Sequence, residues 1–76
     1  MDEKINIKII QIISKIIRTD LNAINEKSGM KDFAKWDSLA HLQIMTEIEK
    51  QFKKKISTSK MSDLNTVGKI LEFLKS

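Results

Sequence analysis

The 76-residue sequence contains no cysteine, no proline and no tyrosine, and it has only two glycines and one histidine. Without cysteine there is no disulfide, no thiolate nucleophile and no cysteine-ligated zinc or iron–sulfur site. Sandwiches and barrels need many tight turns, so the scarcity of proline and glycine favours helices. One histidine cannot build a metal site unaided, and we expect no metal centre.

Arginine and aromatic residues are also scarce, although the chain is basic. Fourteen lysines and arginines against ten acidic residues give a net charge of +4, which taken alone suggests nucleic acid or an anionic surface as partner. All but one of the basic residues are lysines, whereas arginine is the better reader of guanine and phosphate. The few aromatic rings make a poor stacking platform for single strands. A basic helical nucleic-acid-binding or protein-interaction domain therefore remains only the alternative function.

The length predicts one small domain over residues 1–76. A chain of this size buries only about 60% of the surface of its unfolded form, which leaves no room for a deep substrate pocket with a catalytic apparatus. No apolar run is long enough to cross a membrane, and the N-terminal segment resembles neither a signal nor a transit peptide. We therefore expect a cytoplasmic monomer that is not an enzyme and does not insert into a membrane.

Hydrophobic periodicity predicts an all-α fold, a small antiparallel bundle of three to four helices. The first helix spans about residues 2–18, the second begins at Asp37 or Ser38 and ends at Phe52, and the last spans about 65–75, with a minor helix around Met61. Packing within the bundle is favoured over a membrane-surface role for the first helix. The expected inner faces are Ile5, Ile9, Ile12, Ile13 and Ile16; Leu39, Leu42, Ile44, Met45, Ile48 and Phe52; and Val67, Ile70, Leu71 and Leu74.

Residues 19–36 show no sustained hydrophobic period. We interpret them as a long ordered loop between the first two helices, because a loop of this length in a small domain is uncommon and is often functional. Apolar side chains are expected to hold the loop against the bundle: Leu21, Ile24, Met30, Phe33 and Trp36.

The motif Trp36-Asp37-Ser38-Leu39 lies where this loop meets the second helix. A serine at a helix N-terminus has an exposed hydroxyl beside free backbone N–H groups and the positive end of the helix dipole. A phosphate attached to that hydroxyl is therefore well placed. Taken alone, however, Asp37 and Ser38 are more simply explained as a helix cap.

The residues that follow this motif favour an attachment site over a simple helix cap. After Asp-Ser-Leu come an apolar helix that ends in Glu-x-x-Phe, an isoleucine a few residues later, and a short Thr-Val-x-x-Ile helix near the C-terminus. With a first helix and a loop of matching length, the chain resembles an acyl carrier protein over nearly its whole length. The matching residues are Asp37, Ser38, Leu39, Leu42, Ile44, Met45, Ile48, Glu49, Phe52, Ile56, Met61, Leu64, Thr66, Val67, Ile70, Phe73 and Leu74.

This resemblance implies a carrier of acyl or aminoacyl groups. Ser38 would receive 4′-phosphopantetheine covalently from coenzyme A through a phosphopantetheinyl transferase, and the thiol of this arm would hold the cargo as a thioester. Asp37 would help position the transferase and its metal, and Leu39 would be a buried anchor. Enzymes that load, condense or transfer acyl groups would dock on the second helix, at Leu39, Gln43, Thr46, Glu47 and Lys50.

Two departures from the family pattern bear on the pathway. Many carriers for fatty acid synthesis have a glycine where this chain has Lys35, and their second helix is strongly acidic. Here residues 31–52 contain three lysines and four acidic residues, whereas residues 53–76 contain six lysines and two acidic residues. Trp36 before Asp-Ser-Leu is more similar to stand-alone carriers. We therefore expect a specialised lipid, polyketide or metabolite pathway.

Two other features are interpreted as ordinary surface. His41 lies one turn after Ser38, but a hydrolytic Ser–His pair also needs an orienting group and an oxyanion site, so we expect a partly exposed helix residue. The run Lys53, Lys54 and Lys55 is interpreted as a solvated helix end, where cations suit the dipole.

Overall fold

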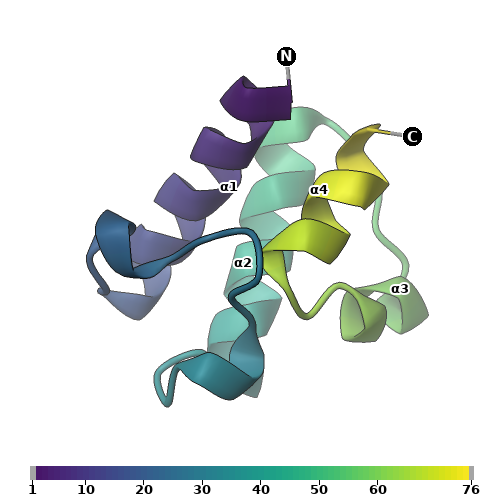
Figure 1. Ribbon diagram of the computed structural model, residues 1–76. Coiled ribbons are helices and arrows are strands. Elements are labelled where there is room, and N and C mark those ends of the chain that lie inside the picture. Colours follow the sequence, from purple (N-terminus) through teal and green to yellow (C-terminus); the bar gives the residue numbers. More distant parts are fainter. Residues whose placement is uncertain (1, 76) are drawn as a thin grey trace.

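The computed structural model describes residues 2–75, which form an all-α bundle without strands. The first helix runs opposite to the second and fourth and packs against both (Figure 1). Among these residues no helix is both long and apolar enough to cross a bilayer. The α-helices are α1 (Asp2–Ile17), α2 (Ser38–Phe52), α3 (Thr58–Asp63) and α4 (Val67–Lys75). The predicted fold class and the minor helix around Met61 are confirmed.

The isoleucines of α1 supply one side of the core. Ile9, Ile12, Ile13 and Ile17 are buried, whereas Ile7, which lies off the predicted arc, is 52% exposed. They meet buried side chains of α2 and α4, among them Ile44, Ile48, Val67 and Ile70. The apolar face of α1 is thus used inside the bundle, as its periodicity predicts.

The helices α1 and α2 are each followed by a residue whose backbone is in the left-handed conformation. Arg18 has φ 54° and Lys53 has φ 51°. Beyond each of them the chain folds back on the helix, with Thr19 N–H donating to the Ser14 carbonyl at 3.1 Å and Lys54 N–H to the Glu49 carbonyl at 3.2 Å. Glycine is the usual residue at such left-handed helix ends, whereas this chain has an arginine and a lysine there.

The segment between α1 and α2 is an ordered loop with two short 3-10 turns, η1 (Leu21–Ala23) and η2 (Met30–Asp32). Ile24 and Trp36 are buried, and Met30 and Phe33 are partly buried against the core. Leu21 is 45% exposed, so the expectation that it holds the loop was wrong. Its short turn leaves the side chain on the outside while Ile24, at the end of that turn, enters the core.

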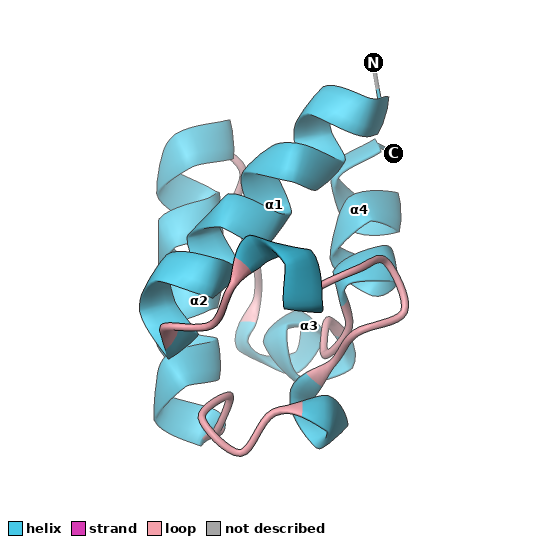
Figure 2. Ribbon diagram, turned by 60° about the vertical axis from the view of Figure 1, so that its left-hand side comes forward, coloured by secondary structure: helices cyan, strands magenta, loops and turns pink. Residues whose placement is uncertain are grey.

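Backbone hydrogen bonds join the middle of this loop to the start of α4 (Figure 2). Gly29 and Thr66 form an antiparallel bridge. The first N–H groups of α4 are satisfied by the loop, because Val67 donates to the Ser28 carbonyl and Gly68 to the Glu26 carbonyl, each at 2.9 Å. A helix start that would otherwise lack partners is therefore capped by a distant segment.

The inner face of α2 differs from the prediction. Its buried residues are Ala40, His41, Ile44, Met45 and Ile48, whereas Leu39 and Leu42 are 67% and 52% exposed. The expected run from Leu39 advanced in steps of three residues, and each such step turns the helix by about −60°, so the run leaves any single face. The predictions that Leu39 is a buried anchor and that Leu42 faces inward were wrong.

Candidate functional site

Asp37 caps the N-terminus of α2. Its carboxylate accepts a hydrogen bond from Ala40 N–H at 2.9 Å, and its carbonyl accepts from His41 N–H at 2.8 Å. An aspartate with extended backbone at this position satisfies the donors of the first turn, which is why the helix begins at Ser38. The cap holds Ser38 as the first helical residue.

The Ser38 hydroxyl is exposed and makes no hydrogen bond within residues 2–75. The backbone N–H groups of Ser38 and Leu39 also lack a partner in that part of the chain. Two free donors at the positive end of a helix suit a phosphate bound to the neighbouring hydroxyl. The residues present therefore fit a phosphodiester at Ser38.

An open hollow of about 440 Å³ lies beside Ser38, between α2 and α3. Its lining combines apolar side chains with hydroxyl groups and includes no lysine, arginine or carboxylate. Such a surface suits an uncharged chain that contains both methylene and amide groups. The lining residues are Met30, Ser38, His41, Leu42, Thr58, Met61 and Ser62.

His41 connects three segments at the floor of this hollow. Its Nδ1 accepts a hydrogen bond from Trp36 Nε1 at 3.0 Å, and its Nε2 lies 2.7 Å from the Met61 carbonyl oxygen. Because the indole N–H is a donor only, Nδ1 must be unprotonated and Nε2–H donates to Met61. The imidazole is therefore neutral, with its proton on Nε2.

The expectation that His41 is partly exposed was wrong, because only 8% of the residue is exposed. It occupies an inner position of α2 that is covered by Trp36 from the loop and by Met61 from α3. The local sequence could have indicated this, since His41 lies on the same helix face as Ile44, Met45 and Ile48. The hydrogen bonds to Trp36 and Met61 could not be predicted from the sequence, because they depend on how the loop and α3 pack against α2. Met61 lies 20 residues away from His41.

The predicted docking residues lie on or near the outer side of α2. Leu39, Gln43, Thr46 and Lys50 are exposed, and Glu47 is half-buried. Glu47 accepts a hydrogen bond from the Gln51 side chain at 2.8 Å. With the exposed Leu42, the start of α2 presents two leucines to solvent beside Ser38.

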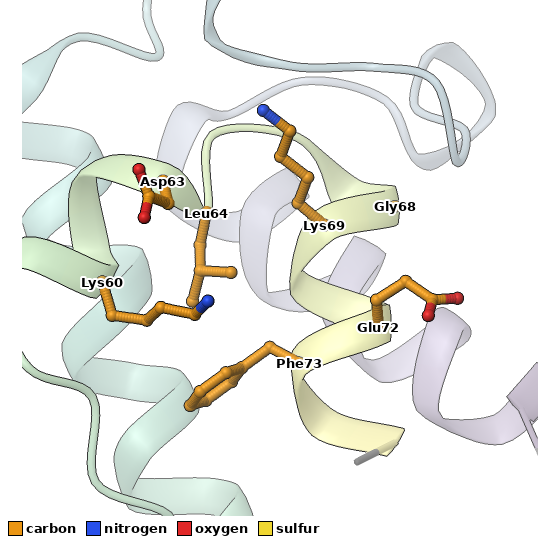
Figure 3. A pocket seen from close by; sticks show the side chains of 7 residues that line it. All are labelled: Lys60, Asp63, Leu64, Gly68, Lys69, Glu72 and Phe73. Carbon is orange, nitrogen blue, oxygen red and sulfur yellow. The ribbon is translucent and has the colours of Figure 1, made fainter.

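A second hollow lies between α3 and α4 (Figure 3). It is lined by Lys60, Asp63, Leu64, Gly68, Lys69, Glu72 and Phe73, and Ser38 is not among them. The Lys60 ammonium lies 5.9 Å from the centre of the Phe73 ring. This hollow is therefore separate from the surroundings of Ser38.

Within residues 2–75, no group of three or more His, Asp or Glu side chains could hold a metal ion.

The lysine run after α2 is only in part a solvated helix end. Lys53 and Lys55 are exposed, as expected. Lys54 is half-buried, donates through Nζ to the Phe73 carbonyl at 2.9 Å, and lies 4.9 Å from the centre of the Phe73 ring. This lysine therefore fastens the end of α2 to the last turn of α4.

Comparison with known proteins agrees with this geometry. Residues 8–74 match a family model described as a phosphopantetheine attachment site. The comparison with curated proteins finds no relative that matches the chain. The family match spans α2, α3, all of α4 except its last residue, and α1 from residue 8 onward, so it includes the whole arrangement around Ser38.

Proposed function

Because this chain belongs to the phosphopantetheine attachment-site family, it is a carrier protein for covalently bound 4′-phosphopantetheine, and we propose that Ser38 is the attachment residue. The observation that carries the proposal is the Ser38 hydroxyl. It is exposed, it makes no hydrogen bond within residues 2–75, and it lies beside two free N–H groups at the start of α2. Carrier domains of this family are generally not catalysts, and we expect partner enzymes to do the chemistry.

The site prepares Ser38 for modification by holding it still and leaving it accessible. Ser38 Oγ forms a bond to the phosphorus that bears pantetheine in coenzyme A. The bond from that phosphorus to adenosine 3′,5′-bisphosphate breaks, and the hydroxyl proton passes to a base of the transferase. The free N–H groups of Ser38 and Leu39 would donate to the phosphate and favour its negative charge. Asp37 keeps the helix start rigid through its bond to Ala40 and is expected to help position the transferase and its metal.

Once attached, the arm supplies a thiol on which an acyl or aminoacyl group is held as a thioester. We expect the arm to rest in the hollow beside Ser38, where Thr58 and Ser62 offer hydroxyl groups and Leu42 offers an apolar surface. The absence of cysteine in the chain leaves the arm as the one thiol available for cargo.

Partner enzymes are expected to dock on the outer side of α2. The support comes from the two exposed leucines, Leu39 and Leu42, beside the exposed polar residues Gln43 and Thr46, with Glu47 and Lys50 one turn further on. Exposed apolar side chains rimmed by polar ones are typical of a protein interaction surface. The helix contains only two acidic residues, so enzymes that recognise a strongly acidic helix should bind weakly. This supports a specialised lipid, polyketide or metabolite pathway. We expect the carrier to act as a cytoplasmic monomer.

The proposal is tested by incubating the folded protein with coenzyme A and a broad-specificity phosphopantetheinyl transferase, followed by intact mass measurement. The wild type should gain the mass of one arm. Ser38→Ala should gain nothing, whereas the matched control Ser62→Ala, which removes a hydroxyl from the same hollow, should still be modified. An unmodified wild type, or a modified Ser38→Ala, would refute the assignment.

The alternative of a basic nucleic-acid-binding domain is tested separately. Such a domain would bind duplex or single-stranded DNA at low salt and lose affinity steeply as salt rises. The family match favours the carrier, and we expect no such salt-dependent binding.

A further inference from the structure

The seam between α2 and α3 next to Ser38 is tied by one hydrogen bond. His41 Nε2 of α2 donates to the Met61 carbonyl of α3 at 2.7 Å. On the other side of the ring, His41 Nδ1 accepts from Trp36 Nε1 at 3.0 Å, and Trp36 is 1% exposed. His41 and Met61 both line the hollow beside Ser38, and Trp36 lies behind His41. We call these three residues the latch.

The latch lies between the hollow and the core. The core residues that follow on α2, Ile44 and Ile48, are completely buried. A chain that passes from Ser38 between α2 and α3 toward them has to separate His41 from Met61. Separation leaves two partly buried polar groups without their partner, the Met61 carbonyl and the His41 Nε2–H, and an unpaired polar group away from water is unfavourable.

We propose that His41 keeps the cargo of this carrier outside the core, so that it holds short acyl or aminoacyl groups in the surface hollow and does not enclose long alkyl chains. The inference rests on the proposed function, since it concerns the group held on the arm at Ser38. The hollow, about 440 Å³ and open to solvent, falls within the size range of small-molecule pockets.

The proposal also explains why the hollow is not purely apolar. Thr58 and Ser62 place hydroxyl groups along it, and His41 presents a neutral ring. These groups suit the amides of the arm and the carbonyl or amine of a small cargo.

The test loads the protein from acetyl-, hexanoyl- and dodecanoyl-coenzyme A with the same transferase. Intact mass reports whether loading occurs, and this readout belongs to the proposed function alone. Two further measurements are made on each loaded form: the melting temperature, and the rate at which hydroxylamine cleaves the thioester. A carrier that encloses its cargo becomes more stable and protects the thioester as the chain lengthens.

For the wild type we expect all three loaded forms to melt together and to react with hydroxylamine at rates within about twofold of one another. His41→Leu removes both hydrogen bonds and places an apolar side chain at the same position. Its dodecanoyl form should melt about 4 °C or more above its acetyl form. His41→Gln, whose amide can both donate and accept, should restore the wild-type pattern. Gln51→Leu, an exposed position near the end of the same helix and outside the proposed docking residues, is the matched control and should also behave as wild type.

Progressive stabilisation and protection of the wild type with chain length would overturn the inference while leaving the attachment at Ser38 intact. An identical response of wild type and His41→Leu would overturn the role of His41. If His41→Leu does not fold, His41→Phe, which keeps an aromatic ring but removes both hydrogen bonds, takes its place, with the same expected gain for the dodecanoyl form. Failure of the folded wild type to load would overturn both the proposed function and this inference, and the mass alone would identify that result.

Discussion

Trp36 donates a hydrogen bond through Nε1 to Nδ1 of His41 over 3.0 Å, and both residues are buried. The two rings are tilted by 32° with their centres 6.0 Å apart. This contact joins the end of the long loop to the first turn of α2, beside Asp37 and Ser38. It also leaves Nε2 of His41 to donate to the Met61 carbonyl of α3. The loop and α3 are therefore hydrogen-bonded to the same imidazole.

The tautomer of His41 is a direct consequence of this contact. We expect the neutral side chain to carry its proton on Nε2, because Nδ1 faces a group that can only donate. Nitrogen NMR of the chain's single histidine measures this at neutral pH. A ring protonated on Nδ1 would contradict the hydrogen-bond scheme.

Removal of the indole donor should destabilise the protein. Trp36→Phe leaves His41 Nδ1 buried without a partner, and we expect a loss of about 1–3 kcal/mol in the free energy of unfolding, before any loss from reduced packing. Urea unfolding measures it. In a His41→Leu background the same substitution should cost less, and equal costs in the two backgrounds would show that the rings are not coupled.

The close approach of the loop to α4 requires glycine at position 29. A Cβ on Gly29 would lie 2.7 Å from the Asn65 carbonyl oxygen and 2.8 Å from Thr66 Cγ2. We expect Gly29→Ala to lower the free energy of unfolding by about 1–3 kcal/mol through this overlap.

The matched control for this substitution is Gly68→Ala. Its Cβ would lie 3.1 Å from the carbonyl oxygen of Glu26, an exposed loop residue that has room to shift, and alanine favours the helix by about 1 kcal/mol. Gly68→Ala should therefore change stability by less than Gly29→Ala in thermal or urea unfolding. Equal losses would mean that the bridge to Thr66 is not the cause.

The left-handed end of α2 offers a stabilising substitution. Lys53 has φ 51°, a conformation in which glycine avoids the steric cost of a Cβ. Lys53→Gly should raise the free energy of unfolding by about 0.5–1 kcal/mol. Lys55→Gly is the control, since Lys55 is exposed and has no positive φ, and it should be neutral or slightly destabilising. Stabilisation by both substitutions would point to the loss of positive charge instead.

Glu49 holds the chain after α2 in place. Its carboxylate accepts a hydrogen bond from Ile56 N–H at 2.7 Å, and Ile56 is buried. Because hydrogen bonds to charged groups are stronger than neutral ones, Glu49→Ala should cost about 1.5–3 kcal/mol of unfolding free energy. Glu47→Ala, which loses only a surface bond to Gln51, should cost about 0.2–0.5 kcal/mol. Similar losses would contradict a specific role for the Ile56 contact.

Much of the local structure followed from the sequence. The isoleucine spacing of α1 predicts the buried face that Ile9 and Ile13 occupy. Asp37 predicts the start of α2, because a short acidic side chain caps a helix whatever its surroundings. The position of Ser38 at that start depends only on these neighbouring residues, so the candidate site was accessible to sequence reasoning.

The inner face of α2 was not predicted correctly from the sequence. Leucines are apolar wherever they lie, so Leu39 and Leu42 were expected inside, although the helix turns them outward. His41 took an inner position because Trp36 and Met61 satisfy both of its ring nitrogens. A buried polar residue is tolerated only with such partners, and composition does not reveal them.

By itself, then, the sequence determined the helices, the loop between the first two, and the serine at the start of the second, because periodicity and capping act between near neighbours. Only the tertiary structure decided which side of α2 faces solvent, that Gly29 lies against Thr66, and that His41 ties α3 to α2. These features depend on segments far apart in the chain, which come together because the apolar faces of α1, α2 and α4 must share one core.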